Sequence, residues 1–490
     1  MMNEREVVMK QESMPIFDIL REHREKNSIS FHVPGHKNGL LMEQTNQLFS
    51  QFLTYDLTEI TGLDDLHDPQ GAIAEAEQLL AQFYGTKKSY FLVNGSTVGN
   101  IAMILASCCE GEHVLVQRNC HKSILNGLML ANVRPVFISP EIDKHSGLPA
   151  SMNHNRVKEA FERYSNIKVC IFTYPDYYGK TYELEQIIEI AHQHGAVVLI
   201  DEAHAPHFQL GDPFPPSSLT MNADVVVHSA HKMLPAMTMG SYLHLNSDRV
   251  SRLDIESYLS ILQSSSPSYP IMASLDIARH YLASFSDEDI AYTMEKREQF
   301  STQLSRHTDL HIHPLERGQD PLKMTIYHPY MTGFELQREL ERLSIYPELA
   351  DPSQVLFTLP LLKQGMIFPY DQAIEKISNI RIDGGKQNQP VMVKLGEYET
   401  EKLSKLTYSY KEMRHLSTEQ VELDEAIGRI AAQMIIPYPP GIPLIMPGEE
   451  IKVEQLDQLN LLIQANARFQ GGEETFLKGK IEVFSSGKPQ

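Results

Sequence analysis

Short apolar runs alternate with helix-like segments along the first half of the chain. The runs expected to form strands are residues 90–93, 113–116, 135–139, 169–173, 196–200 and 225–228. Between them, apolar residues recur at helical spacing. Runs that are apolar throughout fit strands buried on both faces, and the strand–helix rhythm is typical of a doubly wound, mainly parallel sheet. The pattern therefore predicts an α/β fold.

The pattern changes on both sides of this region. Residues 15–28 predict an amphipathic helix, and helical segments dominate beyond Leu245. After about Asp309 short strands alternate with helices, as in a smaller α+β domain; we expect strands at 324–327 and 354–359 and helices at 332–343 and 371–380. The expected division is an N-terminal segment at residues 1–88, a large domain at 89–308 and a small C-terminal domain at 309–490.

Three segments rich in turn-forming residues interrupt these patterns. Phe31–Lys37 reads F-H-V-P-G-H-K, and Asp64–Gly71 precedes a helical pattern at residues 72–83. Each of these two loops is either a structural corner or a wall of a binding site. In Pro437–Glu449, five prolines force an extended path that cannot lie in the centre of a sheet.

Composition and charge narrow the class of protein. With 490 residues, 42% hydrophobic and 22% charged, the chain is an ordinary globular protein, and its formal net charge of −20 argues against a nucleic-acid partner. It has no apolar run of membrane-spanning length and its N-terminus is polar, so we expect a cytoplasmic protein without a membrane partner. The four cysteines and the histidines lack the spacing of metal ligands, so we expect no metal site.

Two of the predicted strands end in reactive side chains. Residues 196–200 lead into Asp201-Glu202-Ala203-His204, and residues 225–228 lead into Ser229-Ala230-His231-Lys232. Ligands of open α/β sheets bind at the carboxyl ends of strands. Pyridoxal phosphate (PLP) enzymes need a Lys amine for a Schiff base and an Asp that keeps the pyridinium nitrogen protonated, so that the ring accepts electrons. This pairing indicates Lys232 and Asp201 for those roles.

Each of these residues alone has an ordinary explanation. A strand-end Asp is often a helix cap, and a Lys after a strand is usually a solvated loop residue. Ser229 and His231, however, flank Lys232 closely enough to reach the cofactor phosphate while the amine reaches its aldehyde. This compact polar set in an apolar neighbourhood favours a cofactor site.

Two further strand exits offer contacts for the same cofactor. Gly95, Ser96 and Thr97 begin a helical stretch after residues 90–93, where free backbone N–H groups and the helix dipole favour an anion. The same residues would serve equally as a plain helix cap. His121, at the exit of residues 113–116, is a candidate to stack on a flat heterocycle, although a lone His is more often a satisfied polar residue.

Eight motifs occur in an order that resembles one family. They are Phe31–Lys37, Asp64–Gly71, Asn94–Asn100, Arg118–Ser123, Asp201–His204, Ser229–Lys232, Ser265–Tyr269 and Pro437–Glu449. Together they resemble the ornithine/lysine/arginine decarboxylases of the aspartate-aminotransferase fold (PLP fold type I). The resemblance covers about residues 15–450, and its F-H-x-P-G-H and P-Y-P-P-G-I-P motifs are not shared by PLP enzymes in general. The chain resembles the short form of the family, which lacks the N-terminal wing domain of the long bacterial forms.

The resemblance implies a role for each candidate residue. Lys232 would bind PLP covalently, Asp201 would pair with its pyridinium nitrogen, and His121 and His204 would lie against its ring. The residues expected to hold the phosphate are Gly95, Ser96, Thr97, Ser229 and His231, together with Ser265 of the partner subunit. The active unit would therefore be a homodimer with two shared sites, alone or assembled into a larger oligomer.

The sequence departs from the family pattern at two places. Asp176 stands where the family usually has the Thr of P-T-Y-x-G, and Thr238 is followed by Met239-Gly240-Ser241 instead of a polar T-Q-x-S run. Both departures lie near the expected rim of the site, so they bear on substrate choice more than on cofactor chemistry.

The expected reaction is PLP-dependent decarboxylation of a basic L-amino acid, which releases carbon dioxide and an amine of polyamine metabolism. Arginine and lysine are the favoured substrates, and ornithine remains open. Lys232 or His204 would return a proton to Cα. A basic side chain would need a carboxylate at the far end of the pocket, and Glu449 is the candidate, with plain surface solvation as the alternative.

Two other functions are compatible with parts of this pattern. An aminotransferase or lyase of the same fold would keep Lys232 and Asp201, and an aminotransferase would add an Arg clamp for the α-carboxylate, for which Arg381 lies in a suitable region. A PLP-free regulator of polyamine metabolism would be expected to have lost the Lys or the Asp, and this sequence has both.

Overall fold

The computed structural model describes residues 10–43, 46–142, 149–380, 402–438, 443–464, 467–470 and 473–485. Contacts between Cα atoms divide the chain into two compact units. The first unit comprises Met1–Ser107, Leu199–Gly211 and Pro216–Ser286, and the second comprises Cys108–Val198, Asp212–Pro215 and Asp287–Gln490. The domain boundaries expected at residues 88 and 308 follow the sequence pattern and stay a prediction.

The first unit contains a mixed sheet. Its strands, in spatial order, are β1 (Lys88–Leu92), β9 (Ser241–Leu245), β8 (Val225–His228) and β7 (Val197–Asp201). β8 is parallel to β7, with Val225 opposite Leu199, whereas β9 is antiparallel to both β8 and β1. β9 was not among the predicted strands, although all its residues are buried. The helices that precede, follow or cover these strands are α3 (Ala72–Tyr84), α4 (Gly95–Ser107), α8 (Ala230–Met233), η2 (Pro206–Leu210), α9 (Arg252–Leu262) and α10 (Tyr269–Ala283).

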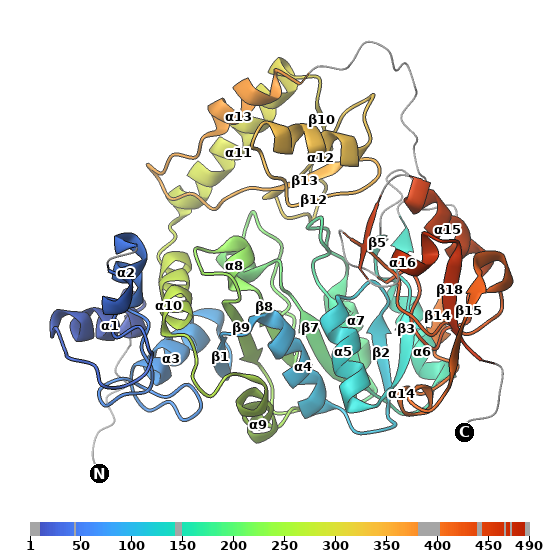
Figure 1. The fold of residues 1–490 in the computed structure, drawn as a ribbon, viewed down its shortest axis with the longest axis horizontal. Coiled ribbons are helices and arrows are strands. Elements are labelled where there is room, and N and C mark those ends of the chain that lie inside the picture. Colours follow the sequence, from blue (N-terminus) through green and yellow to red (C-terminus); the bar gives the residue numbers. More distant parts are fainter. Residues whose placement is uncertain are drawn as a thin grey trace. The chain divides into compact units, whose positions relative to one another are not determined.

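The N-terminal helix α1 (Pro15–Glu25) packs against α10 in the same unit (Figure 1). Its apolar face buries Ile16 and Leu20 completely, as the amphipathic pattern predicts. The backbone N–H of Ile16 donates to Asp276 Oδ2 on α10 at 3.0 Å, so a buried carboxylate caps the start of α1. Two short helices follow α1, η1 (Leu40–Met42) and α2 (Gln47–Leu53).

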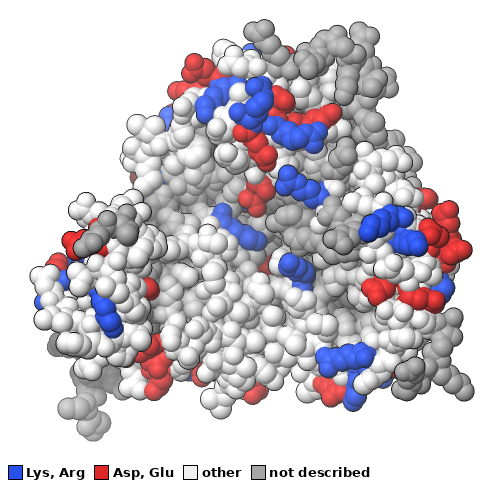
Figure 2. Space-filling view, viewed as in Figure 1, with Lys and Arg blue, Asp and Glu red and all other residues white. Residues whose placement is uncertain are grey.

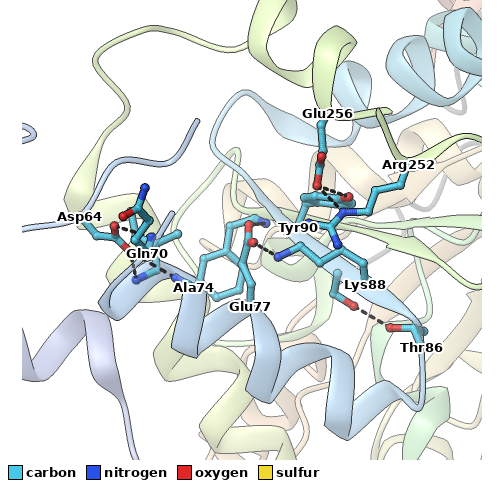
Figure 3. Close-up of polar contacts among 12 residues, drawn as sticks. Asp64, Gln70, Ala74, Glu77, Thr86, Lys88, Tyr90, Arg252 and Glu256 are labelled. Atoms are coloured by element: carbon cyan, nitrogen blue, oxygen red, sulfur yellow. Dashed lines mark hydrogen bonds and ion pairs between the residues drawn. The ribbon is translucent and has the colours of Figure 1, made fainter. Parts of the chain in front are cut away.

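The loop before α3 is organised by the carboxylate of Asp64 (Figure 3). Asp64 Oδ2 accepts hydrogen bonds from the backbone N–H groups of Gly71 and Ile73, each at 2.8 Å, and from Ala74 at 3.2 Å. These bonds satisfy donors that the first turn of a helix leaves without intrahelical partners. Asp64–Gly71 therefore acts as a structural corner that starts α3.

Side chains occupy the edge of β1, the outermost strand of this sheet. Glu77 on α3 is buried; it pairs with Lys88 Nζ at 2.7 Å and accepts from the backbone N–H of Phe91 (Figure 3). Gln263, after α9, accepts from the backbone N–H of Val93 at 2.9 Å. Because these donors are satisfied by side chains, the edge does not offer them to another strand.

The second unit contains a sheet of similar design. Its strands, in spatial order, are β6 (Ile167–Thr173), β2 (His113–Gln117), β3 (Arg134–Ile138) and β14 (Leu403–Lys405). β2 is parallel to both β6 and β3, and β14 adds antiparallel to β3 from a position much later in the chain. The helices of this region are α5 (Lys122–Ala131), α6 (His154–Arg163) and α7 (Leu184–Gln193), and a small ribbon joins β4 (Glu141–Ile142) to β5 (Pro149–Ser151).

The rest of the second unit forms two smaller groups of elements. The first has a four-stranded antiparallel sheet in the order β10 (His311–Ile312), β11 (Lys323–Tyr327), β13 (Val355–Thr358) and β12 (Leu349–Ala350), with helices α11 (Asp287–His307), α12 (Gly333–Arg342) and α13 (Tyr370–Ile377). The second consists of α14 (Tyr410–Met413), β15 (Thr418–Glu422), η3 (Leu423–Glu425), β16 (Ile436–Tyr438), α15 (Val453–Gln464), β17 (Arg468–Gln470), α16 (Glu473–Phe476) and β18 (Lys480–Phe484). An apolar cluster that includes Ile435, Ile445 and Leu459 forms the core of this second group.

The six strands predicted in the first half of the chain are all present as β1, β2, β3, β6, β7 and β8, and the predicted α/β class is confirmed. Pro437 lies in β16, which belongs to a two-stranded ribbon, and residues 439–442 lie outside the described part of the chain. Among the described residues, no helix is long and apolar enough to cross a membrane. On the face shown in Figure 2, basic and acidic side chains are intermingled rather than separated by sign.

Candidate active site

Asp201 is fixed at the carboxyl end of β7. Its side chain is buried, Oδ2 accepts from Asn100 Nδ2 on α4 at 3.0 Å, and Oδ1 accepts from the backbone N–H of Ala203 at 3.2 Å. Both oxygens are therefore oriented by partners in the first unit. Asn100 was not assigned a role from the sequence, although its position four residues after Ser96 places both on one face of a helix.

Lys232 lies in the short helix α8 directly after β8. Its Nζ is 3.0 Å from Nε2 of His204, which is buried three residues after Asp201. The parallel pairing of β7 with β8 brings these strand ends together, as expected for neighbouring parallel strands. An amine and an imidazole at hydrogen-bonding distance can exchange a proton directly.

The turn at Met239-Gly240 supports the segment that bears Lys232. The Gly240 carbonyl oxygen accepts from the backbone N–H of His231 at 3.1 Å and from its ring Nδ1 at 3.0 Å. The Met239 carbonyl oxygen accepts from the backbone N–H of Gly95 at 2.9 Å, and Met239 itself has a left-handed φ of 79°. This departure from the family pattern therefore joins the Lys232 segment to the start of α4.

The start of α4 has the form of an anion site. Gly95 has a φ of 80°, and a Cβ at this position would have no atom within 4 Å. Ser229 Oγ donates to Ser96 Oγ at 2.7 Å, so two of the predicted phosphate ligands meet, and Thr97 is exposed beside them. Backbone N–H groups in the first turn of a 13-residue helix add the positive end of its dipole.

Two other residues expected at the site, His121 and Ser265, are among the described residues. His121, in the second unit, is the N-cap of α5, and its Nδ1 accepts from the backbone N–H of Ser123 at 3.2 Å. Ser265 is exposed, and the backbone N–H of its neighbour Ser264 is 3.4 Å from Asn94 Oδ1 of the same chain. Arg381 is outside the described residues.

Glu449 is buried in the second unit, where it forms an ion pair with Arg118. Arg118 Nη2 donates to Glu449 Oε2 at 2.9 Å, and Nη1 donates to Oε1. This environment differs from the solvated surface considered as the alternative for Glu449. The role of Glu449 in substrate binding stays a prediction.

Asp176 lies in the loop after β6. It accepts from the backbone N–H groups of Lys180 at 2.8 Å and Tyr178 at 2.9 Å, and burial raises the pKa of its carboxyl to about 7. The Tyr178 hydroxyl donates to Asp351 Oδ2 at 2.6 Å, which joins this loop to the segment before β13. The second departure from the family pattern is thus a carboxyl that titrates near neutral pH.

Two family models match long stretches of this chain. Residues 14–319 match the major domain of the Orn/Lys/Arg decarboxylases, and residues 392–486 match their C-terminal domain. The chain is 45% identical over 472 residues to the uncharacterized protein YaaO of Bacillus subtilis, covering 93% of this chain and 96% of that protein. It is 31% identical over 494 residues to an arginine decarboxylase of Bacillus anthracis, covering 98% and 99% of the two chains.

A solved structure confirms the predicted fold. The Escherichia coli constitutive lysine decarboxylase superimposes with a TM-score of 0.78 at 20% identity, covering 96% of this chain and 82% of that one. The expected PLP fold type I is therefore correct. From the two domain matches, the chain belongs to the Orn/Lys/Arg decarboxylase family and is a PLP-dependent decarboxylase that acts on a basic amino acid.

Proposed function

We propose that this enzyme removes the α-carboxylate of L-arginine, or alternatively of L-lysine, as carbon dioxide. The observation that carries the proposal is the contact of Lys232 Nζ with His204 Nε2 beside Asp201. Arginine is placed first because an arginine decarboxylase is 31% identical across 98% of this chain. Ornithine is a third candidate. Polyamine-related metabolism and a cytoplasmic location belong to the same proposal, and the amine product supports the first of them.

The first unit provides groups that fit PLP. Lys232 would hold the cofactor aldehyde, and Asp201, oriented by Asn100, would hold the pyridinium nitrogen. Residues proposed to hold the phosphate are Gly95, Ser96, Thr97, Ser229 and His231. His121 is proposed, on the resemblance, to stack on the ring. When bound, PLP supplies an electron sink for the pair of electrons left at Cα as the carboxylate departs.

The chain's own residues would manage the proton that each turnover consumes. Lys232 would hold the cofactor while no substrate is bound, and its Nζ would be able to move a proton when substrate is present. His204 Nε2 lies 3.0 Å from this Nζ. His204 can resupply Lys232 after Lys232 gives a proton to Cα, or His204 can donate to Cα itself.

A homodimer is part of the proposal. Large apolar side chains of the N-terminal segment are strongly exposed, among them Phe31 at 95%, Ile29 at 85% and Leu48 at 81%. Large apolar side chains as exposed as these favour burial against another protein. A second copy of the chain would cover it and supply Ser265 of the partner subunit to the phosphate. Sedimentation of the wild type and of Phe31→Asp tests this part, because the variant should dissociate at higher concentration than the wild type.

The reaction is tested by incubating the PLP-loaded protein separately with arginine, lysine and ornithine while carbon dioxide and amine are measured. We expect release from one of the three and at least a 10³-fold loss in Lys232→Ala, since the covalent attachment point is removed. Lys158→Ala, an exposed Lys on α6, is the matched control and should keep full activity. Formation of a keto acid without carbon dioxide would instead identify an aminotransferase.

A further inference from the structure

Arg118 and Glu449 form a buried ion pair that joins two of the family motifs. Arg118 follows β2 directly, and Glu449 ends the proline-rich segment 331 residues later. The guanidinium engages both carboxylate oxygens, and its Nη2 also donates to the Leu444 carbonyl oxygen at 3.3 Å. The two side chains are only 16% and 8% exposed. Paired donors on one guanidinium fix the angle as well as the distance of the contact.

The carboxylate is held firmly on its own side. The backbone N–H of Met446 donates to Glu449 Oε2 at 3.1 Å, and the Glu449 carbonyl oxygen accepts from Ala431 at 2.8 Å. Ala431 and Ile445 belong to the apolar core of the C-terminal group of elements. The position of Glu449 is thus set by that core and not by its own rotamer alone.

Arg118 is the first residue of the short loop that leads to His121. The backbone N–H of Arg118 donates to the Ile138 carbonyl oxygen at 2.9 Å, and His121 caps α5 three residues later. Burial raises the pKa of the Tyr410 hydroxyl on α14, and Cys120 and Glu449 raise it further. The loop from Arg118 to His121 is therefore fixed at one end by the C-terminal core and at the other by α5.

The charge of Arg118 bears on whether Glu449 orients a loop or binds the substrate. The carboxylate already has a cation on both of its oxygens, so a basic substrate side chain would have to displace Arg118. Buried ion pairs contribute little net stability because desolvation offsets their attraction, and their best-attested use is to fix register. This favours a contact that orients a loop over one that binds substrate.

We propose that Arg118 and Glu449 are positioning residues that lock the C-terminal domain to the loop before α5 and so hold His121 in the orientation that stacking on the cofactor requires. The inference rests on the proposed function of His121. It assigns the C-terminal domain a part in cofactor retention. It also predicts that substitution of Arg118 and substitution of Glu449 have the same effect on PLP binding. If Glu449 were instead a substrate ligand, the two substitutions would have different effects.

The test is a double-mutant cycle read by PLP affinity. Arg118→Ala, Glu449→Ala and the double variant are titrated with PLP in the absence of substrate. A small displacement of a positioned group can lower the rate of an enzyme by about 10²-fold. On that scale, we expect each single variant to raise the Kd for PLP by about 10- to 100-fold. The double variant should match the single variants, because each change already opens the same contact.

Two controls separate loop positioning from general damage. Arg118→Lys keeps the charge but loses the paired donors, so it should weaken PLP binding while the protein stays folded by circular dichroism. Arg429→Ala breaks an ion pair with Glu419 in the same domain that is 30% and 46% exposed, and it should leave PLP affinity unchanged.

Several results would overturn the inference. Multiplicative effects in the double variant would show that the two residues act independently. A Glu449→Ala variant that binds PLP normally but has a raised KM for the amino acid would identify Glu449 as a substrate ligand. Because PLP affinity is measured without substrate, failure of the wild type to release carbon dioxide would refute the proposed reaction separately.

Discussion

Arg279 offers a sharp test of how α1 is held to the first unit. The guanidinium on α10 is completely buried and donates to Asp276 Oδ1 at 2.8 Å, to the Gln11 carbonyl oxygen at 2.8 Å, to Gln11 Oε1 at 3.0 Å and to the Ser13 carbonyl oxygen. Asp276, also buried, accepts from the first turn of α1. One arginine therefore fixes the segment before α1 and neutralises the carboxylate that caps it.

The change Arg279→Leu should release α1. It keeps an apolar side chain of moderate size but leaves Asp276 as an uncompensated buried charge, a change that costs about 3–5 kcal/mol. Since 1.4 kcal/mol corresponds to a factor of ten, local opening of α1 should become roughly 10²- to 10³-fold more frequent, or somewhat more. Burial raises the pKa of Asp276 even with Arg279 present, so the loss should shrink as the pH falls and the carboxyl takes up a proton.

Amide hydrogen exchange of α1 measures this opening directly. The matched control is Arg342→Leu on α12, which breaks a pair of the same i,i+3 spacing with Glu339 whose side chains are 62% and 33% exposed. That change should cost less than about 1 kcal/mol, or fivefold in local exchange. Adding Asp276→Asn to Arg279→Leu should recover part of the loss by removing the stranded charge. Equal effects of Arg279→Leu and Arg342→Leu would refute the reasoning.

Two further predictions concern Asp176 and Gly333, both in the second unit. The pKa of Asp176 rises from 3.8 to about 7 on burial, so its contribution to stability is complete below pH 3.8 and is lost as the pH rises through 7. The Tm of Asp176→Asn should therefore decrease less between pH 5 and 8 than the Tm of the wild type. An equal decrease in the two proteins would contradict this reasoning. Gly333→Ala would place a Cβ against the backbone oxygens of Asp351 and Gln354, so it should lower the free energy of unfolding by about 1–3 kcal/mol, measured by thermal unfolding. The control is Gly35→Ala, where a Cβ meets open space and the loss should be less than about 0.5 kcal/mol.

The strands that the sequence predicted best are those with mainly apolar residues. Residues 113–116 and 225–228 are mainly apolar, as suits strands covered on both faces, and the structure places strands there. β9, Ser241–Leu245, contains a Ser and a His, and His244 is accommodated by a buried bond to Ser89 Oγ at 2.7 Å. A polar residue satisfied by a distant partner breaks the apolar pattern, so this strand was missed. β14 was missed because its register depends on a partner far away in the chain.

The placement of two candidate site residues was predictable because it follows directly from the strand ends. Lys232 and His204 were both singled out, and the pairing of β7 with β8 brings them together. The support from Asn100 and Met239 was not predicted, since an amide on a helix and a left-handed Met have no distinctive sequence signal. The ion pair of Glu449 was not predicted either, because only the folded chain reveals that Arg118 faces it.

The addition of β14 to β3 has a consequence for synthesis of the chain (Figure 1). Ile138 pairs with Leu403, so about 260 residues must be made after β3 before its outer edge is covered. At about 5–20 residues per second, that edge waits roughly 13–50 s on the ribosome. An uncovered, apolar strand edge recruits other strands, so the nascent chain passes through a long interval in which aggregation competes with folding. Mutations that delay or delete the segment around β14 should therefore lower the yield of folded enzyme before they affect its chemistry.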